Sequence, residues 1–192
     1  ENLKNENITK GVHHVGDIMY DAVVHMKRKT EAVTEIQGIS LEGPIAACTV
    51  HRAENTDDKA ILSEILEYLN SYTKEYKVVL PVHPRTANAV RKHGLSFGDI
   101  TTIEPVGYRE MQALLGASQL VFTDSGGLQK EAYFHRKPCT TLRDETEWVE
   151  TIEAGWNRLW KGADFASPRT DIADYGDGKS AERILDLIAS AG

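Results

Sequence analysis

From residue 44 onward, short apolar runs alternate with segments whose apolar residues recur at helical spacing. The runs predict strands at 44–50, 77–82, 100–103, 119–123 and 138–142. Helical spacing predicts helices after residue 57, through 87–94, and at 108–117, 127–134, 145–154 and 179–189. The strands are near-continuous apolar runs rather than alternating ones, which indicates that both faces of the sheet are covered. The alternation therefore predicts an α/β fold with a single Rossmann-like, doubly wound parallel sheet.

The ends of the predicted elements carry stop and start signals. Either Asp57 or Asp58 can cap the first helix of the sheet unit, and Gly94 is a natural end for the next. Before this unit lies one amphipathic helix, from residue 16 to about residue 29, which has no place in the alternation. We therefore divide the chain into a polar linker or boundary segment (1–15), an interdomain connector (16–43) and a Rossmann-like domain (44–192).

Composition narrows the classes of partner. An apolar fraction of 41% and a charged fraction of 27% are ordinary for one globular domain of 192 residues. The net charge of −7 argues against a nucleic-acid partner, although it allows a local basic pocket for one phosphorylated ligand. Cys48 and Cys139 lie in apolar runs and are interpreted as small buried thiols, which suits a reducing cytoplasm. No apolar run predicts a membrane span.

Polar side chains gather where the predicted strands end, which is where open α/β sheets bind ligands. His51, Arg52, Glu54 and Asn55 follow the first strand. An imidazole that titrates near neutrality beside a fixed guanidinium suits an anionic leaving group. The alternative is a solvated loop with a capping residue, but His51 and Arg52 extend no cap.

A second histidine, His83, ends the next strand, and Pro84 fits the start of the helix after it. Two histidines at equivalent strand ends predict a shared site. A metal pair is the competing interpretation, but no third ligand stands at convincing spacing and no His-Glu-x-x-His motif is present. We expect no metal and no other cofactor.

The strongest signal is the segment 123–131, in which a strand runs through Ser125, Gly126 and Gly127 directly into a helix. Glycines let backbone N–H groups approach an anion, and the helix amino terminus adds its positive dipole end. Glu131 falls one turn into the helix, where it can accept hydrogen bonds from a vicinal diol such as ribose. Taken alone, the segment could be a glycine turn with a surface Glu. Together with the other strand ends it predicts a phosphate and ribose site.

Arg143 follows the next strand and leads into an acidic run at 144–147. It could reach a diphosphate, or it could pair with Glu147 at a charged helix start. Both interpretations remain open from the sequence.

In order, these segments resemble the family of non-hydrolysing UDP-N-acetylglucosamine 2-epimerases. Residues 51–55 match the family's His-Arg-x-Glu-Asn motif, residues 124–131 its Asp-Ser-Gly-Gly-x-Gln-x-Glu motif, and residues 15–21 its interdomain stretch. The resemblance spans nearly the whole chain. It implies the carboxy-terminal, UDP-binding half of a GT-B architecture, in which two Rossmann-like domains face each other.

The resemblance also implies a reaction and its residues. UDP is eliminated to leave a glycal and is then added back with C2 inverted. His51 would be the catalytic residue beside the scissile bond, the 125–127 turn would hold the diphosphate, and Glu131 would hold the ribose. The full set of substrate-binding residues implied is Arg52, Glu54, Asn55, His83, Tyr108, Met111, Ser125, Gly126, Gly127, Glu131 and Arg143, with Tyr108 and Met111 in the uracil pocket.

The carboxylates that move the C2 proton come, in the family, from the missing amino-terminal domain. The fragment alone is therefore expected to be inactive, and its expected partners are a UDP-sugar and that domain, within a homodimeric parent. One departure concerns the sugar. Glu147-Trp148-Val149-Glu150 replaces a common Glu-Arg-Pro-Glu, which together with residues 83–86 indicates a branch acting on a modified sugar such as a diacetamido-uronic acid.

Two other functions compete with epimerisation. A donor-binding domain of a GT-B glycosyltransferase also places a glycine turn and a ribose-binding Glu here, but the His-Arg-x-Glu-Asn motif discriminates against it. A regulatory nucleotide-sugar-binding module without catalysis would describe the fragment as well.

Overall fold

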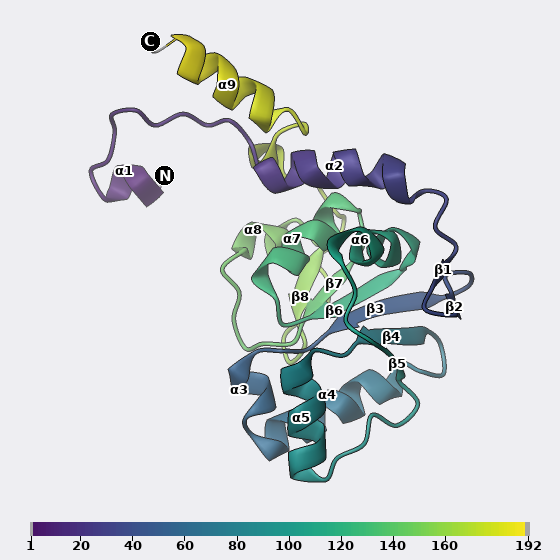
Figure 1. Cartoon of the computed structure of the whole chain (residues 1–192). Coiled ribbons are helices and arrows are strands. Elements are labelled where there is room, and N and C mark those ends of the chain that lie inside the picture. Colours follow the sequence, from purple (N-terminus) through teal and green to yellow (C-terminus); the bar gives the residue numbers. More distant parts are fainter. Residues whose placement is uncertain (1, 191–192) are drawn as a thin grey trace.

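A six-stranded, all-parallel sheet forms the centre of the molecule, and helices cover both of its faces (Figure 1). The computed structural model describes residues 2–190, so residue 1 of the predicted linker and residues 191–192 of the predicted domain lie outside the described residues. The strands are β3 (Ile45–Thr49), β4 (Lys77–Pro81), β5 (Thr101–Ile103), β6 (Leu120–Thr123), β7 (Cys139–Thr141) and β8 (Asn157–Leu159). The predicted α/β class and doubly wound parallel sheet are confirmed.

The strand order is β5-β4-β3-β6-β7-β8. The chain therefore winds outward from β3 to β5, returns to the centre, and winds outward again from β6 to β8. The order reverses between β3 and β6, which pair in parallel from Ala46 opposite Leu120 to Thr49 opposite Thr123. Such a reversal opens a crevice at the carboxyl ends of the two central strands, where ligands bind in open α/β sheets.

The helices around the sheet divide into two layers, as Figure 1 shows. They are α3 (Ala53–Thr56), α4 (Lys59–Ser71), α5 (Pro84–His93), α6 (Tyr108–Ala117), α7 (Gly126–Phe134) and α8 (Val149–Glu153). Helices α4 and α5 cover one face, and α6 and α7 cover the other. Of the two candidate caps, Asp58 begins α4, because its carboxylate accepts from the N–H groups of Ala60 and Ile61. Gly94, in the left-handed conformation, ends α5 as predicted.

Alternate residues of each strand enter different cores. In β3, Ala46 and Cys48 pack with the residues of α4, whereas Ile45 and Ala47 pack with those of α6. This two-sided burial is the physical reason why the strands are apolar throughout. Cys48 and Cys139 are buried free thiols, which confirms their interpretation from the sequence.

The predicted helix at 145–154 is wrong over its first half, because α8 spans only Val149–Glu153. Side-chain hydrogen bonds hold the preceding segment as a loop. Thr146 Oγ1 donates to Gln129 Oε1 (2.6 Å) and accepts from the Trp148 amide (3.1 Å), and the Trp148 indole N–H donates to the Gly126 carbonyl (2.8 Å). These contacts bind the loop to α7 and outweigh its local helical pattern.

Three short strands lie outside the predicted set. β8 is a three-residue edge strand whose Asn-Arg-Leu sequence has no apolar run. β1 (Glu35–Ile36) and β2 (Ile39–Ser40) form a hairpin within the predicted connector. Its turn residues, Gln37 and Gly38, both have positive φ, the geometry that two-residue hairpins favour.

The segments before β3 and after β8 lie outside the sheet, and one of their helices, α2, packs over α6 and α7. They contain α1 (Asn2–Asn5), α2 (Ile18–Thr30), the 3₁₀ turn Ala173–Tyr175 and α9 (Ser180–Ser190). Helix α2 packs on α6, α7 and α9 (Figure 1). Asp21 in α2 caps α9 by accepting from the amides of Ser180 (3.0 Å) and Ala181 (2.7 Å). That residues 16–43 connect to another domain stays a prediction. Among the described residues, no helix has the length and apolar character to cross a membrane.

Candidate functional site

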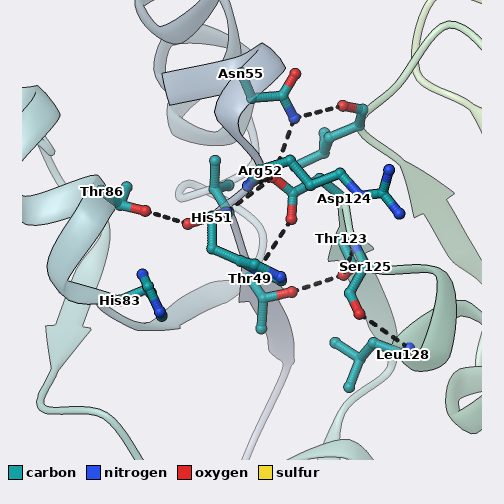
Figure 2. Close-up of polar contacts among 12 residues, drawn as sticks. Thr49, His51, Arg52, Asn55, His83, Thr86, Thr123, Asp124, Ser125 and Leu128 are labelled. Atoms are coloured by element: carbon teal, nitrogen blue, oxygen red, sulfur yellow. Dashed lines mark hydrogen bonds and ion pairs between the residues drawn. The ribbon is translucent and has the colours of Figure 1, made fainter. Parts of the chain in front are cut away.

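One buried carboxylate organises the crevice between β3 and β6. Asp124, directly after β6, has no exposed surface. Its Oδ2 accepts three hydrogen bonds, from the amides of His51 and Arg52 (both 2.8 Å) and from Asn55 Nδ2 (3.1 Å), as Figure 2 shows. Asn55 Nδ2 also donates to the Leu142 carbonyl (2.9 Å). Asp124 and Asn55 thus tie together the loops that follow β3, β6 and β7.

Asp124 belongs to a motif that the sequence displayed, but no role was predicted for it. The signal available was an acidic residue at the very end of a wholly apolar strand. A charged group at that depth must be paired or hydrogen-bonded. Asn55 is likewise buried in this network, so it braces the loops in the ligand-free protein, and its contact with substrate stays a prediction.

The same carboxylate orients His51. Its Oδ1 lies 3.3 Å from His51 Nδ1 and makes no hydrogen bond of standard geometry within residues 2–190. Because a carboxylate offers only acceptors, Nδ1 is the nitrogen that carries a proton toward it. Nε2 is then the nitrogen that can exchange a proton outside the pair. The imidazole is 40% exposed, so a ligand in the crevice can reach it.

The two predicted histidines do share one site. The rings of His51 and His83 lie 5.7 Å apart between centroids (Figure 2). His83 is the N-cap of α5, and its Nδ1 accepts from the Arg85 amide (3.1 Å), which leaves Nε2 as the donor in the neutral ring. A hollow of about 160 Å³ adjoins the pair and is also lined by Pro105, Val106 and Met111. Met111, predicted for the uracil pocket, therefore lies beside the histidines.

The glycine turn begins α7 as predicted. Ser125 is the N-cap, and its Oγ accepts from the Leu128 amide at 3.5 Å (Figure 2). The first turn of a helix leaves its N–H groups without helical acceptors, so those of Gly126 and Gly127 are available to an anion. A side chain at Gly126 would overlap the Glu147 carboxylate, which shows how closely the 143–148 loop covers this turn.

Two arginines and two carboxylates form a charge cluster beside the turn. Arg143 Nε contacts Glu54 Oε1 (3.0 Å), and its Nη1 contacts Glu147 Oε2 (2.8 Å). Arg52 lies 3.8 Å from Glu54 and 3.9 Å from Glu147. The backbone amide of Glu147, and then Arg143, hold the pKa of this carboxyl below its ordinary value. Arg143 therefore pairs with Glu54 and Glu147 in the structure, and its contact with a diphosphate stays a prediction.

Glu131 lies between α6 and α7 and is only 8% exposed, so it is not a surface position of its helix. Burial raises the pKa of its carboxyl, while the hydroxyl of Tyr108 and the amide of Gln112 oppose that rise. Burial, and then the nearby Glu131, raise the pKa of Tyr108 to about 12. Residues four apart share one helix face, so Glu131 stands one turn below Gly127. The predicted phosphate and diol positions thus line one side of α7.

Within residues 2–190, no cluster of three or more His, Cys, Asp or Glu side chains has the geometry to hold a metal ion. The site instead presents N–H groups, two arginines and two imidazoles around a helix amino terminus. This arrangement can bind an anion and exchange a proton with it.

Comparison with known proteins agrees with this geometry. The family model for UDP-N-acetylglucosamine 2-epimerase matches residues 1–189. A UDP-2,3-diacetamido-2,3-dideoxy-D-glucuronate 2-epimerase of Pseudomonas aeruginosa is 42% identical over 98% of this chain and 56% of its own length. A UDP-N-acetylglucosamine 2-epimerase of Methanococcus maripaludis is 35% identical over 97% of this chain and 57% of its own.

Among solved structures, the Methanocaldococcus jannaschii UDP-GlcNAc 2-epimerase in complex with UDP-GlcNAc and UDP matches with a TM-score of 0.83. It is 32% identical, and the match covers 98% of this chain and 58% of that protein. The chain thus spans little more than half the length of the relatives that it matches.

Proposed function

Because the chain belongs to the UDP-N-acetylglucosamine 2-epimerase family, we propose that it is the UDP-sugar-binding half of a GT-B epimerase that inverts C2 of the sugar. The observation that carries the proposal is the buried Asp124, which fixes His51 at the crevice beside the amino terminus of α7. One residue thereby couples a proton-exchanging group to an anion-binding turn. The match to a relative solved with UDP-GlcNAc and UDP supports the same ligand class.

The nucleotide would run along α7. The diphosphate would accept from the N–H groups of Gly126 and Gly127 and from the Ser125 hydroxyl, with the helix dipole adding to its binding. The ribose diol would donate to Glu131 one turn further along. Tyr108 and Met111, in the first turn of α6, would contact the uracil. This arrangement orients the sugar–phosphate bond toward His51.

His51 would serve the departure of UDP. When the C1–O bond breaks, its electron pair goes to the phosphate oxygen, and the C2 proton goes to a base. When the ring carries a proton on both nitrogens, His51 Nε2 can donate to that oxygen as negative charge builds, while Asp124 stabilises the positive ring from the Nδ1 side. Arg52 and Arg143 supply further positive charge next to the leaving group. On the way back, UDP is added to C1 again and a proton is delivered to C2 on the face opposite to the one from which it was removed.

The sugar itself is proposed to be a modified one, such as a diacetamido-uronic acid. The diacetamido-glucuronate epimerase of P. aeruginosa is 42% identical, against 35% for the N-acetylglucosamine epimerase of M. maripaludis. The segment 147–150, which departs from the common Glu-Arg-Pro-Glu, contains Trp148, whose indole N–H donates to the Gly126 carbonyl and so fixes this loop beside the proposed phosphate turn. Membership in the family leaves the glycosyltransferase alternative without support.

Isotope exchange tests the proposal. The chain alone, and the chain joined to the remaining domain of its parent, are incubated in deuterated water with UDP-N-acetylglucosamine or the diacetamido-uronic analogue. We expect deuterium at C2, seen by NMR, only with the two-domain protein. In calorimetry, the chain alone should bind UDP more tightly than UMP or ADP.

Each outcome has a distinct meaning. Deuterium incorporation by the 192-residue chain would show that the acid/base groups lie within it. A two-domain protein that exchanges neither sugar would refute the epimerase proposal. Equal binding of ADP and UDP would remove the uridine assignment.

A further inference from the structure

Helices α6 and α7 face each other with two stacked pairs of polar residues. Tyr108 and Gln112 stand four residues apart on α6, and Glu131 and His135 stand four residues apart on α7 and its C-cap. Gln112 has no exposed surface, and His135 is 6% exposed. His135 Nε2 lies 2.8 Å from Gln112 Oε1. Neither Gln112 nor His135 has a place in the mechanism above.

The neighbours of the Gln112 amide fix which way it points. Its oxygen faces His135, so its nitrogen faces Glu131. The nitrogen is buried, and within residues 2–190 it makes no hydrogen bond of standard geometry. The reverse orientation would set the amide oxygen against the acceptor-only carboxylate of Glu131.

His135 supports this orientation because it is a neutral donor. Burial, and then Lys27 and Lys137, lower the pKa of its imidazole to about 4. The neutral ring has one N–H, and the contact with Gln112 Oε1 places that proton on Nε2. The charged and titratable groups around this pair are thus Lys27 from α2, Lys137 after α7, and Tyr108 and Glu131 in the stacked pair above.

We propose that Gln112, held by His135, is a positioning residue that aims the Glu131 carboxylate at the vicinal diol of the nucleotide. The inference rests on the proposed function, since it deepens the account of the same ribose site. The Tyr108 hydroxyl and the Gln112 amide, both on α6, are the side-chain groups that lower the pKa of the carboxyl, and within the described chain the Gln112 nitrogen is left free to donate to it. The remaining lone pairs are then directed toward the ligand.

A pH profile distinguishes this role from mere packing. Burial raises the pKa of Glu131, and Gln112 is one of two groups that oppose the rise. Without its amide, the carboxyl should take up its proton at higher pH, and a protonated carboxyl no longer accepts two hydrogen bonds from a diol. As the pH is lowered, the preference for a ligand with an intact diol should therefore disappear at a higher pH in a Gln112 variant than in the wild type.

The experiment compares the affinities of UDP and 2′-deoxy-UDP from mildly acidic to neutral pH by calorimetry. Both ligands carry the same diphosphate, so the ratio of their affinities cancels the titration of the phosphates. We expect the wild-type chain to bind UDP about tenfold or more tightly than 2′-deoxy-UDP, because the deoxy ligand loses a hydrogen bond to a charged acceptor. In Gln112→Leu the preference for UDP over 2′-deoxy-UDP should fall several-fold at neutral pH. The pH at which half of that preference is lost should move upward.

Gln129→Leu is the matched control. Gln129 is also buried, also has an amide nitrogen without a hydrogen bond of standard geometry in the described chain, and contacts Thr146 and Asn157 instead. The Gln129→Leu variant should be less stable than the wild type, but its preference for UDP over 2′-deoxy-UDP and the pH midpoint of that preference should not change. His135→Phe, which frees the Gln112 amide to rotate, should shift the preference in the same direction as Gln112→Leu and covers the case in which that variant fails to fold.

The outcomes separate the two proposals. In one outcome the wild-type chain binds UDP and prefers it over 2′-deoxy-UDP while Gln112→Leu or His135→Phe shows the same preference and the same pH midpoint. That result overturns the inference and leaves the proposed function standing. A shift of equal size in Gln129→Leu also overturns it. A wild-type chain that does not bind UDP overturns the proposed function and the inference with it.

Discussion

Substitutions of Asp124 should separate its structural role from its effect on His51. Asp124→Ala orphans three buried donors, the amides of His51 and Arg52 and one N–H of Asn55. Each orphaned donor costs about 1–3 kcal/mol, so the loss should reach about 3 kcal/mol or more. A domain of this kind has about 5–15 kcal/mol in total. Asp124→Ala should therefore be close to unfolding.

Asp124→Asn keeps an oxygen for the same three donors. A neutral acceptor is about half as strong as a charged one, so this variant should lose less stability than Asp124→Ala, in which the three donors have no acceptor at all. Its new NH₂ group, however, faces His51 Nδ1, which must then accept rather than donate. The ring proton moves to Nε2, and the ring loses its counter-charge. We expect turnover of the two-domain protein to fall about 10²–10⁴-fold while UDP affinity stays near the wild-type value.

Three measurements check this prediction. Urea denaturation compares the stabilities of the two variants, nitrogen NMR reports which His51 nitrogen carries the proton, and calorimetry gives UDP affinity. Equal stability of Asp124→Ala and Asp124→Asn would show that the three hydrogen bonds are not what the carboxylate contributes. Wild-type turnover in Asp124→Asn would refute the orientation of His51 by Asp124.

Two further substitutions test the phosphate and ribose ends of the site. Glu131→Gln and Glu131→Ala should each weaken UDP binding by about 10–100-fold, because a buried charged acceptor to a diol contributes about 1.5–3 kcal/mol. If calorimetry shows unchanged UDP affinity in both variants, Glu131 is a structural residue only. Glu147→Gln should tighten UDP binding several-fold, most at low salt, because it frees Arg143 and removes a negative charge beside the turn. Weaker binding in calorimetry would show instead that Glu147 supports the bound state.

The sequence was sufficient to predict the sheet and to predict which residues lie at the ends of its strands, for physical reasons. Both faces of the central strands are buried, so their apolar runs are continuous and easy to recognise. Strand ends in such sheets face one crevice, so His51, His83 and Ser125 could be assigned to it without coordinates. The order of the strands in the sheet could not be predicted in this way, because an apolar run shows that a strand is buried but not which strand lies beside it.

The missed features depend on contacts between distant segments. Asp124 stands in a visible motif, but its role follows from three donors on the β3 loop, 69 to 73 residues away. The helix prediction at 145–154 failed because Thr146 and Trp148 bind residues of α7. β8 pairs with β7 as an edge strand and needs no apolar run. Local pattern cannot show any of these.

The proposed division of labour between this chain and a second domain is supported by how the site's carboxylates are engaged. Asp124 accepts hydrogen bonds from three donors and has no exposed surface. Glu54 and Glu147 are paired with Arg143, and Glu131 is buried against α6, a full turn beyond the phosphate turn. A general base must be unpaired and within reach of the proton that it removes. None of these four carboxylates meets both conditions, whereas a carboxylate on a facing domain could. The geometry of this half therefore favours a base outside it, and deuterium exchange with and without the remaining domain tests that argument directly.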